Sequence, residues 1–249
     1  MKRFSIFLLF LIVGCALNAQ DDYRNYVLSR TMLNGTGTSY LDNITYYDGL
    51  GRPFQTVQKA VSDDKSLNKN LVTLQEYDAA GREWNSWLPT FAGSSDYLAP
   101  ASIKSSAPGY YDNDSRPYSQ PVYEASPLNR LTAQYGPGVA WYNAGRSVKT
   151  EYLLNTNASP LKCIKYGVNS TGGLTGNSTT FYTSGELSVV KTTDEDLNVS
   201  YSFTDKQGHT VLTRQMNNSE EHDTYYIYND KGNLCFVLQP KYQIGRAHV

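Results

Sequence analysis

The chain holds few residues whose types and spacing fit catalysis. Its 3 histidines are His209, His222 and His248, and only His222 has an acid beside it, Asp223. An imidazole oriented by a carboxylate is the general base of a hydrolytic triad. No Gly-x-Ser-x-Gly sequence supplies a nucleophile. We therefore expect residues 222–223 to be a solvent-exposed turn pair and not a catalytic pair.

Two short acidic runs have the residue types of a calcium loop. Residues 112–114 (Asp-Asn-Asp) and 194–196 (Asp-Glu-Asp) carry carboxylates at i and i+2. Neither continues into the spacing of an EF-hand, so both are expected to be solvated acidic turns. Residues 35–37 (Gly-Thr-Gly) lack the third glycine and the Lys-Ser/Thr ending of a phosphate loop. The chain has 23 Asp and Glu residues, and their spacing alone does not single out the two carboxylates that a glycosidase requires.

The chain has only 3 cysteines, one of which, Cys15, lies near the N-terminus. Cys163 and Cys235 lie among apolar neighbours. An exported chain could pair them, and two buried free thiols are the alternative. Two cysteines cannot form a structural zinc site alone, and Cys-x-x-Cys is absent. The sequence thus predicts no enzyme, no cofactor and no metal site.

The N-terminus has the pattern of an export signal. Lys2 and Arg3 precede an apolar run over residues 4–13, which is too short to span a bilayer. We expect cleavage near Ala19 or Gln20, and we interpret residues 1–20 as a signal peptide. The alternative is lipidation of Cys15, because residues 12–15 (Ile-Val-Gly-Cys) resemble a lipobox. Either route predicts a secreted or outer cell-surface protein, and no later segment is apolar enough to span a membrane.

Composition favours a β protein. The chain of 249 residues has 21 Tyr against 8 Phe, 40% apolar residues and 18% charged residues. This is a globular composition rich in residues that favour strands and turns. The net charge is 22 − 23 = −1, which argues against a nucleic-acid binder.

One motif recurs along the chain: an aromatic strand, Asp, one or two residues, Gly, a polar residue and a second strand. Asp in the first turn position accepts backbone N–H groups, and Gly takes the left-handed conformation that closes a type I turn with a bulge. In the last copy only Lys231 separates Asp230 from Gly232, so Asn229 is expected in the first turn position. A flanking Tyr can pack on the neighbouring hairpin. The turn residues of the motif are Asp48, Gly51, Arg52, Asp78, Gly81, Arg82, Asp205, Gly208, Asp230 and Gly232.

Weaker relatives of the motif fill the gaps. Residues 123–131 and 181–190 are predicted to form strand, turn and strand. Gly185, Gly208 and Gly232 are spaced 208 − 185 = 23 and 232 − 208 = 24 residues apart, and a fixed period is typical of a repeat array. Between Pro89 and Pro121 the pattern lapses, and we expect an ordered Pro-rich excursion with a short helix around 98–104. Stacked hairpins can bury an apolar face that a single hairpin cannot.

The ordered motifs resemble a known family. Residues 48–53 (DGLGRP), 76–82 (EYDAAGR) and 118–130 (YSQPVYEASPLNR) are similar to the N-terminal domain of unknown function of RHS/YD-repeat proteins of Bacteroidetes-type bacteria. Residues 222–238 resemble the segment that follows it there. The resemblance implies a spiralling sheet of hairpins that closes into a hollow shell, which in some members holds a C-terminal toxin. The core cleavage motif and any effector lie outside this sequence, so no residue inherits their activity.

These observations predict an antiparallel array of stacked β-hairpins that begins an RHS-type shell. The expected organisation is the signal at 1–20, an N-terminal domain at 21–155 and further hairpins at 156–243. Residues 244–249 can be encoded by the opening bases of a sequencing adapter, and we interpret them as a scar. The expected function is structural: to initiate or cap the shell, with downstream repeats of its own chain as partner. The alternative is a surface module whose Tyr-rich faces bind a glycan or a protein. A sheet edge is expected to stay open.

Overall fold

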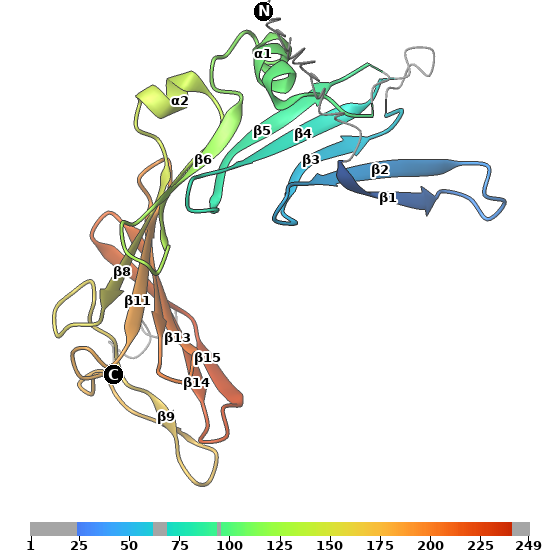
Figure 1. The fold of residues 1–249 in the computed structure, drawn as a ribbon. Coiled ribbons are helices and arrows are strands. Elements are labelled where there is room, and N and C mark those ends of the chain that lie inside the picture. Colours follow the sequence, from blue (N-terminus) through green and yellow to red (C-terminus); the bar gives the residue numbers. More distant parts are fainter. Residues whose placement is uncertain (1–23, 62–68, 94–95, 241–249) are drawn as a thin grey trace, which may run out of the picture.

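The structure is a computed structural model that describes residues 24–61, 69–93 and 96–240 (Figure 1). The predicted signal segment, with Cys15, Ala19 and Gln20, lies outside these residues, as does the segment 244–249. Within these residues, thirteen strands form one antiparallel sheet in sequence order, and one pairing, of residues 148–154 with residues 188–193, bypasses the two short strands between them. The prediction of a mainly β fold made of antiparallel hairpins is therefore confirmed.

The sheet bends between β6 and β8, and Figure 1 shows an upper and a lower part. The upper part consists of β1 (Asn25–Met32), β2 (Tyr40–Tyr47), β3 (Pro53–Gln58), β4 (Leu71–Tyr77), β5 (Glu83–Phe91), β6 (Tyr118–Tyr123) and β7 (Leu131–Tyr135). The lower part consists of β8 (Val148–Leu154), β11 (Ser188–Thr193), β12 (Val199–Thr204), β13 (Thr210–Asn217), β14 (Glu220–Tyr228) and β15 (Leu234–Leu238). A separate two-stranded sheet is formed by β9 (Gly167–Val168) and β10 (Leu174–Thr175).

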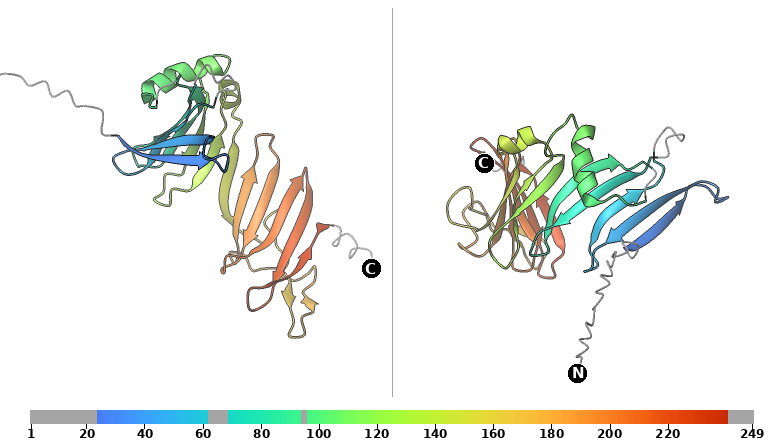
Figure 2. Two further views of the ribbon diagram at one scale, coloured as in Figure 1. Left: turned by 90° about the vertical axis from the view of Figure 1, so that its right-hand side faces the viewer. Right: turned by 45° about the horizontal axis from the view of Figure 1, so that its top comes forward.

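A helix covers one face of the upper part. Ile44, Val57 and Val72 stand opposite one another on β2, β3 and β4 and are buried. Ile103 of α1 (Pro100–Tyr110) packs against them, and the views of Figure 2 place this helix over the upper part only. The helix predicted around 98–104 is present, although it begins at Pro100 and extends to Tyr110, because Pro favours the first helical turn.

The polypeptide between β8 and β11 covers the lower part. Val189, Phe203, Leu212 and Tyr225 form a row of directly opposed, buried residues on four successive strands. Cys163, which lies in the covering segment, belongs to the same core. Burial of such apolar rows is the main favourable term in folding, at about 25 cal/mol per Å².

The two covers lie on the same face of the sheet. Directly opposed residues of an antiparallel pair share a face, so the buried face can be followed from strand to strand. It runs through Leu74, Trp87 and Tyr118, and continues to Lys149 and Leu153 of β8, which lead into the lower core. A second short helix, α2 (Val139–Asn143), also lies on this side, because the ring of Tyr142 contacts that of Tyr135 at 4.9 Å.

The opposite face is uncovered and uncharged along the middle of the described strands. It lies on the inner side of the bend, since α1 and α2 lie on the outer side in Figure 1. Charged pairs such as Lys191–Glu151 lie on the covered face instead. The inner face consists mostly of hydroxyl and amide side chains, among them Thr45, Thr56, Thr73, Gln75, Ser86, Ser119, Gln134, Thr150, Thr192, Ser200, Ser202, Thr213 and Thr224.

One predicted hairpin is wrong. Residues 181–190 do not form strand, turn and strand. Phe181 makes an isolated bridge with Ile164, whereas β11 pairs with β8 and β12. The segment between β8 and β11 folds back so that residue 181 lies beside residue 164. A local turn motif cannot predict such a contact between distant residues. The Gly185 turn thus belongs to the cover, although its φ of 81° matches the hairpin glycines.

Candidate functional site

The recurring turns share one hydrogen-bond pattern. Asp48 donates its N–H to the carbonyl of Arg52 (2.9 Å), and Gly51 donates its own to the carbonyl of Asp48 (3.0 Å). Asp48 Oδ1 accepts the N–H groups of Leu50 (2.9 Å) and Arg52 (3.0 Å). Gly51 has a φ of +77°, which glycine adopts without steric cost.

The other turns repeat this pattern. Asp78 and Asp205 occupy the first position, with Gly81 (φ 81°) and Gly208 (φ 88°) at the fourth. In the last hairpin Asn229 holds the first position, and Asp230 follows it as an exposed second residue. Gly232 has a φ of 77° there.

The second carboxylate oxygen binds the side chain that follows the glycine. Arg52 Nε donates to Asp48 Oδ2 at 2.8 Å, and Arg82 Nε donates to Asp78 Oδ2 at the same distance. These bonds, after those from the Arg52 and Arg82 backbone N–H groups, hold the pKa values of Asp48 and Asp78 below the ordinary range. In the hairpin of β12 and β13, His209 Nδ1 lies 3.1 Å from Asp205 Oδ2.

Each of these side chains lies over a tyrosine of the following hairpin. The Arg52 guanidinium is 4.2 Å from the ring centroid of Tyr77, and that of Arg82 is 4.5 Å from Tyr123. His209 stacks on Tyr228 at 4.5 Å and 18°. The two arginine–tyrosine contacts contribute about 0.5–1 kcal/mol each at exposed sites.

The tyrosine hydroxyl closes the link between hairpins. Tyr77 donates to the carbonyl of Pro53 at 2.8 Å, and Tyr123 donates to the carbonyl of Glu83 at 3.1 Å. Each acceptor is the residue directly after the stacked arginine. We call this Asp–Arg–Tyr arrangement the turn ladder. The flanking tyrosine of the sequence motif is the local signal for it.

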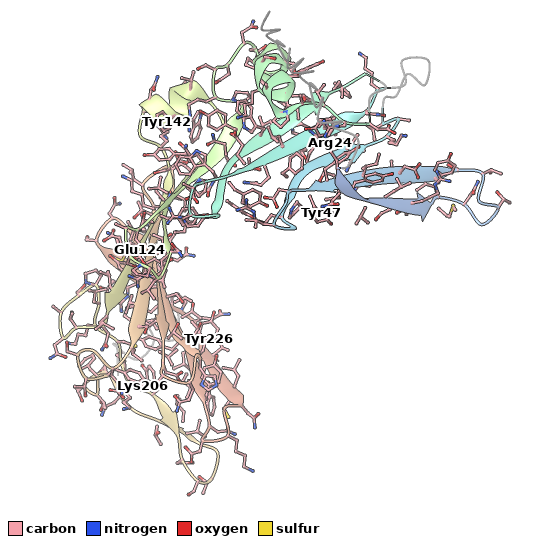
Figure 3. The ribbon with its side chains drawn as sticks, viewed as in Figure 1. Arg24, Tyr47, Glu124, Tyr142, Lys206 and Tyr226 are labelled. Atoms are coloured by element: carbon pink, nitrogen blue, oxygen red, sulfur yellow. The ribbon has the colours of Figure 1, made fainter. Side chains whose placement is uncertain are left out.

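A third unit of the turn ladder is formed by a turn of different length, between β6 and β7. Glu124 replaces Asp, and its carboxylate accepts both Nε (2.9 Å) and Nη2 (2.8 Å) of Arg130. These bonds lower the pKa of Glu124 to about 2. Arg130 lies 4.4 Å from the ring centroid of Tyr152, and Figure 3 shows Glu124 at the bend of the sheet. This unit therefore joins the two parts of the sheet.

Two further copies of the turn depart from the sequence motif. The turn between β11 and β12 starts at Asp194 and has Leu197 (φ 69°) where the other turns have glycine. The turn between β9 and β10 starts at Asn169 and ends with Gly172 (φ 83°). Neither has the aromatic residue before the turn that defined the motif.

The acidic runs serve turns and a helix start. Asp194 uses its carboxylate to hold its own turn, with Oδ1 accepting the N–H groups of Asp196 (2.9 Å) and Asn198 (2.8 Å). Asp114 accepts the N–H groups of Arg116 (2.7 Å) and Val139 (3.0 Å). In the described part of the chain, no group of three or more His, Cys, Asp or Glu is placed to hold a metal ion.

Residues 222–223 lie on β14 and are not the exposed turn pair that the sequence suggested. His222 is exposed on the inner face. Asp223 is buried on the other face, and its oxygens accept Nε and Nη2 of Arg214 at 2.7 and 2.6 Å. Adjacent strand residues point to opposite faces, so this histidine and this acid cannot act on one substrate.

Arg214 ties the cover to the sheet. It also donates from Nη1 to the carbonyl of Pro160 at 2.6 Å, and Asp223 Oδ2 accepts the hydroxyl of Tyr225 at 3.2 Å. The ion pair is almost fully buried, with side chains 4% and 7% exposed. Arg214 Nη2 also lies 3.0 Å from Glu221 Oε2, so removing Asp223 would leave the buried arginine with only a part-exposed acid as counter-charge.

The two cysteines lie in different environments. Both are free; Cys163 is buried and Cys235 is exposed. Neither a disulfide nor a pair of buried thiols is therefore formed. Burial raises the pKa of the Cys163 thiol to about 12, so it stays protonated near neutral pH.

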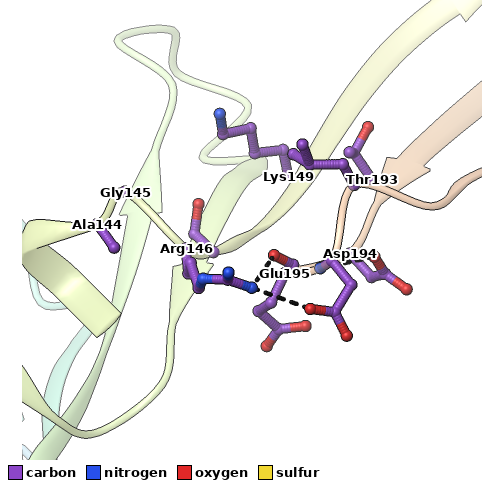
Figure 4. A pocket seen from close by; sticks show the side chains of 10 residues that line it. Ala144, Gly145, Arg146, Lys149, Thr193, Asp194 and Glu195 are labelled. Atoms are coloured by element: carbon purple, nitrogen blue, oxygen red, sulfur yellow. Dashed lines mark hydrogen bonds and ion pairs between the residues drawn. The ribbon is translucent and has the colours of Figure 1, made fainter. Parts of the chain in front are cut away.

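A small cavity of about 260 Å³ lies between the end of α2 and the β11–β12 turn (Figure 4). Arg146 Nη1 crosses it to the carbonyl of Glu195 (3.3 Å) and to Asp196 Oδ1 (2.9 Å). The guanidinium of Arg146 thereby binds two residues of the acidic run 194–196. The cavity is therefore bridged by its own residues.

Comparison with known proteins gave one family and a structural likeness. The profile of a family described as "Domain of unknown function (DUF6443)" matches residues 20–154. No curated protein sequence matches the chain. A solved structure described as "Crystal Structure of TcdB2-TccC3-TEV" superimposes with a TM-score of 0.47 and 12% identity, over 90% of this chain and 10% of that chain. The chain thus spans about a tenth of that protein's length. No helix in the described ranges is long and apolar enough to cross a membrane.

Proposed function

Because this chain belongs to the DUF6443 family, described as a domain of unknown function, we propose that it is a non-catalytic structural segment of an exported RHS/YD-repeat protein. It initiates or caps a shell of β-hairpins, and its inner face forms part of the wall. Its partner is the set of hairpins that continues the sheet from β15. The resemblance of residues 48–53, 76–82 and 118–130 to RHS/YD-repeat proteins supports this assignment.

The observation that carries the proposal is the asymmetry of the sheet. One face is covered by α1, α2 and the segment before β11, while the inner face of the bend is uncovered and uncharged along its middle. Surfaces in contact with bulk water are normally rich in charge of both signs. A broad surface of hydroxyl and amide groups suits the wall of an enclosed space, because a wall without charges would form no ion pairs with an enclosed polypeptide.

The turn ladder supports the same function. It fixes each hairpin to the next at one end of the sheet through Arg52, Arg82 and Arg130. A stack that is locked pair by pair can be continued by adding hairpins. Within the described residues no strand pairs with the outer edge of β15, where Leu234 and Val237 are 51% and 47% exposed, and this edge offers the place for the next strand.

The test is imaging of this chain joined to the hairpins that follow it in its reading frame. The frame is first sequenced past the codon for Tyr242. Electron cryomicroscopy should then show a strand added to β15 and the inner face turned toward an enclosed space. A closed particle with this face on the outside, or no strand on β15, contradicts the proposal.

A further inference from the structure

A second concave feature lies on the outer, covered face and is independent of the proposed shell function. The groove has a volume of about 650 Å³ and lies between residues 165–187 of the cover and the last two hairpin turns. Its size is within the range of small-molecule sites. Leu187, Val211 and Ile227 line it and are buried apolar residues. We propose that this groove binds a neutral oligosaccharide.

The charges of the groove balance. Lys165, Lys206 and Lys231 line it together with Glu186, Asp205 and Asp230, which gives 3 − 3 = 0. Lys165 and Glu186 already pair with each other at 2.9 Å, and the Asp205 carboxylate is used within its own turn. A charged ligand would gain little net attraction here, since the lining carries both signs in equal number.

The remaining polar groups supply both donors and acceptors. Lys206, Lys231 and Asp230 make no ion pair within the described residues, and the Tyr182 hydroxyl makes no hydrogen bond there. Lys206 lies in the lower part of Figure 3. Sugar hydroxyls need donors and acceptors together, because a buried hydroxyl without a partner is costly.

Aromatic rings complete the chemistry. Tyr182 lines one side of the groove, and the stacked rings of His209 and Tyr228 line it from the turn side. The C–H faces of a pyranose ring pack favourably on such rings, and its hydroxyls point to the rim. The lining therefore combines aromatic rings with charged and amide groups, which matches the mixed surface of a sugar ring.

An extended peptide fits less well. Peptides that bind by strand addition require an unpaired sheet edge. The groove lies against the ends of β12, β13 and β14, each of which is paired on both sides. The backbone groups that a peptide would use are therefore already occupied.

The experiment uses the fluorescently labelled protein on an array printed with neutral and sialylated glycans, followed by calorimetric titration of the strongest neutral binder. We expect neutral glycans to bind. Affinity should fall at least fivefold in Tyr182→Phe and at least tenfold in the double variant Asp230→Ala/Lys231→Ala, whose residues are exposed and whose folding should be unchanged.

The matched controls lie elsewhere on the surface. Tyr40→Phe removes an exposed tyrosine hydroxyl, and Asp112→Ala/Lys149→Ala removes one exposed charge of each sign. Both should bind as the parent does. The inference is overturned if no neutral glycan binds, if sialylated glycans are preferred, or if the groove variants bind as tightly as the controls. Binding of an extended peptide that the groove variants abolish would overturn it as well. None of these results depends on whether the shell forms.

Discussion

The guanidinium of Arg82 lies 4.5 Å from the ring centroid of Tyr123, whose hydroxyl donates to the carbonyl of Glu83, 40 positions earlier in the chain and directly after Arg82. The same guanidinium is held at 2.8 Å by Asp78. One side chain thus closes its own turn and fixes the next hairpin. The stability of the array should depend on this side chain more than its partial exposure suggests.

Replacing this arginine tests the turn ladder. Arg82→Ala should lower the free energy of unfolding by about 1–2 kcal/mol, because it removes a charge-assisted hydrogen bond and a cation–π contact. Arg82→Lys should recover only part of the loss, since an ammonium cannot bond Asp78 and cover Tyr123 in the same geometry. Urea unfolding measures both, with the exposed Lys206→Ala as control. Equal stability of all variants would show that the ladder contributes nothing.

Two glycines of one turn separate backbone strain from packing. A Cβ at Gly51 or at Gly49 would meet no atom within 4 Å, and only Gly51 has a positive φ. Gly51→Val should therefore cost about 1–2 kcal/mol through backbone strain alone, while Gly49→Val should cost much less. Thermal melting of the two variants checks this. Similar losses in both would contradict the turn assignment.

The turn between β11 and β12 allows the reverse change. Leu197 has a φ of 69° and is 75% exposed, so it pays for a left-handed conformation without burying its side chain. Leu197→Gly should stabilise the protein by about 0.5–1 kcal/mol, the relief of strain being partly offset by the freer unfolded chain. Leu50→Gly, at an exposed turn position without positive φ, should not stabilise it. Chemical denaturation compares the two.

Acid should loosen the bend of the sheet. The pKa of Glu124 falls from 4.5 to about 2 in the folded protein, so its ionised form is favoured there over the unfolded chain. This contribution is complete above pH 4.5 and is lost as the pH falls toward about 2. Glu124→Gln should therefore be less stable than the parent at neutral pH, and the difference should shrink over this window. A difference that is constant with pH would refute the assignment.

The buried ion pair should matter for stability, and its neighbour should not. Asp223→Ala leaves the buried Arg214 with only the part-exposed Glu221 as counter-charge and should cost about 3 kcal/mol. His222→Ala changes an exposed side chain on the other face and should stay within about 0.5 kcal/mol. Unfolding curves measured in parallel test this contrast. A comparable loss in both variants would place the two side chains on one face, against the strand register.

The turns and their order could be predicted because their information is local. Asp48, Gly51 and Arg52 lie within five consecutive residues, and the hydrogen bonds that select Asp and Gly there join those residues to one another. The alternation of apolar and polar residues likewise fixes which side chains of a strand share a face. A mainly antiparallel fold with hairpins at these positions follows from such patterns.

Other features could not be predicted, because they depend on contacts between distant residues. Phe181 pairs with Ile164 and does not start a hairpin. Asp223 is buried and forms an ion pair with Arg214, which lies on the neighbouring strand. The turn at Asp194 does not match the sequence motif, because Leu197 replaces the expected glycine. In that turn, hydrogen bonds of the carboxylate hold a backbone conformation that the residue type alone disfavours.

The sequence by itself determined the turns, the strands and the alternation of their side chains, since each of these arises from interactions among neighbours in the chain. Only the tertiary structure decided that α1, α2 and the segment before β11 all cover one face, and that the other face is left uncharged on the inner side of the bend. The side on which a crossing segment packs is set by the register of thirteen strands together. No single hairpin contains that information, because it is a property of the assembled sheet.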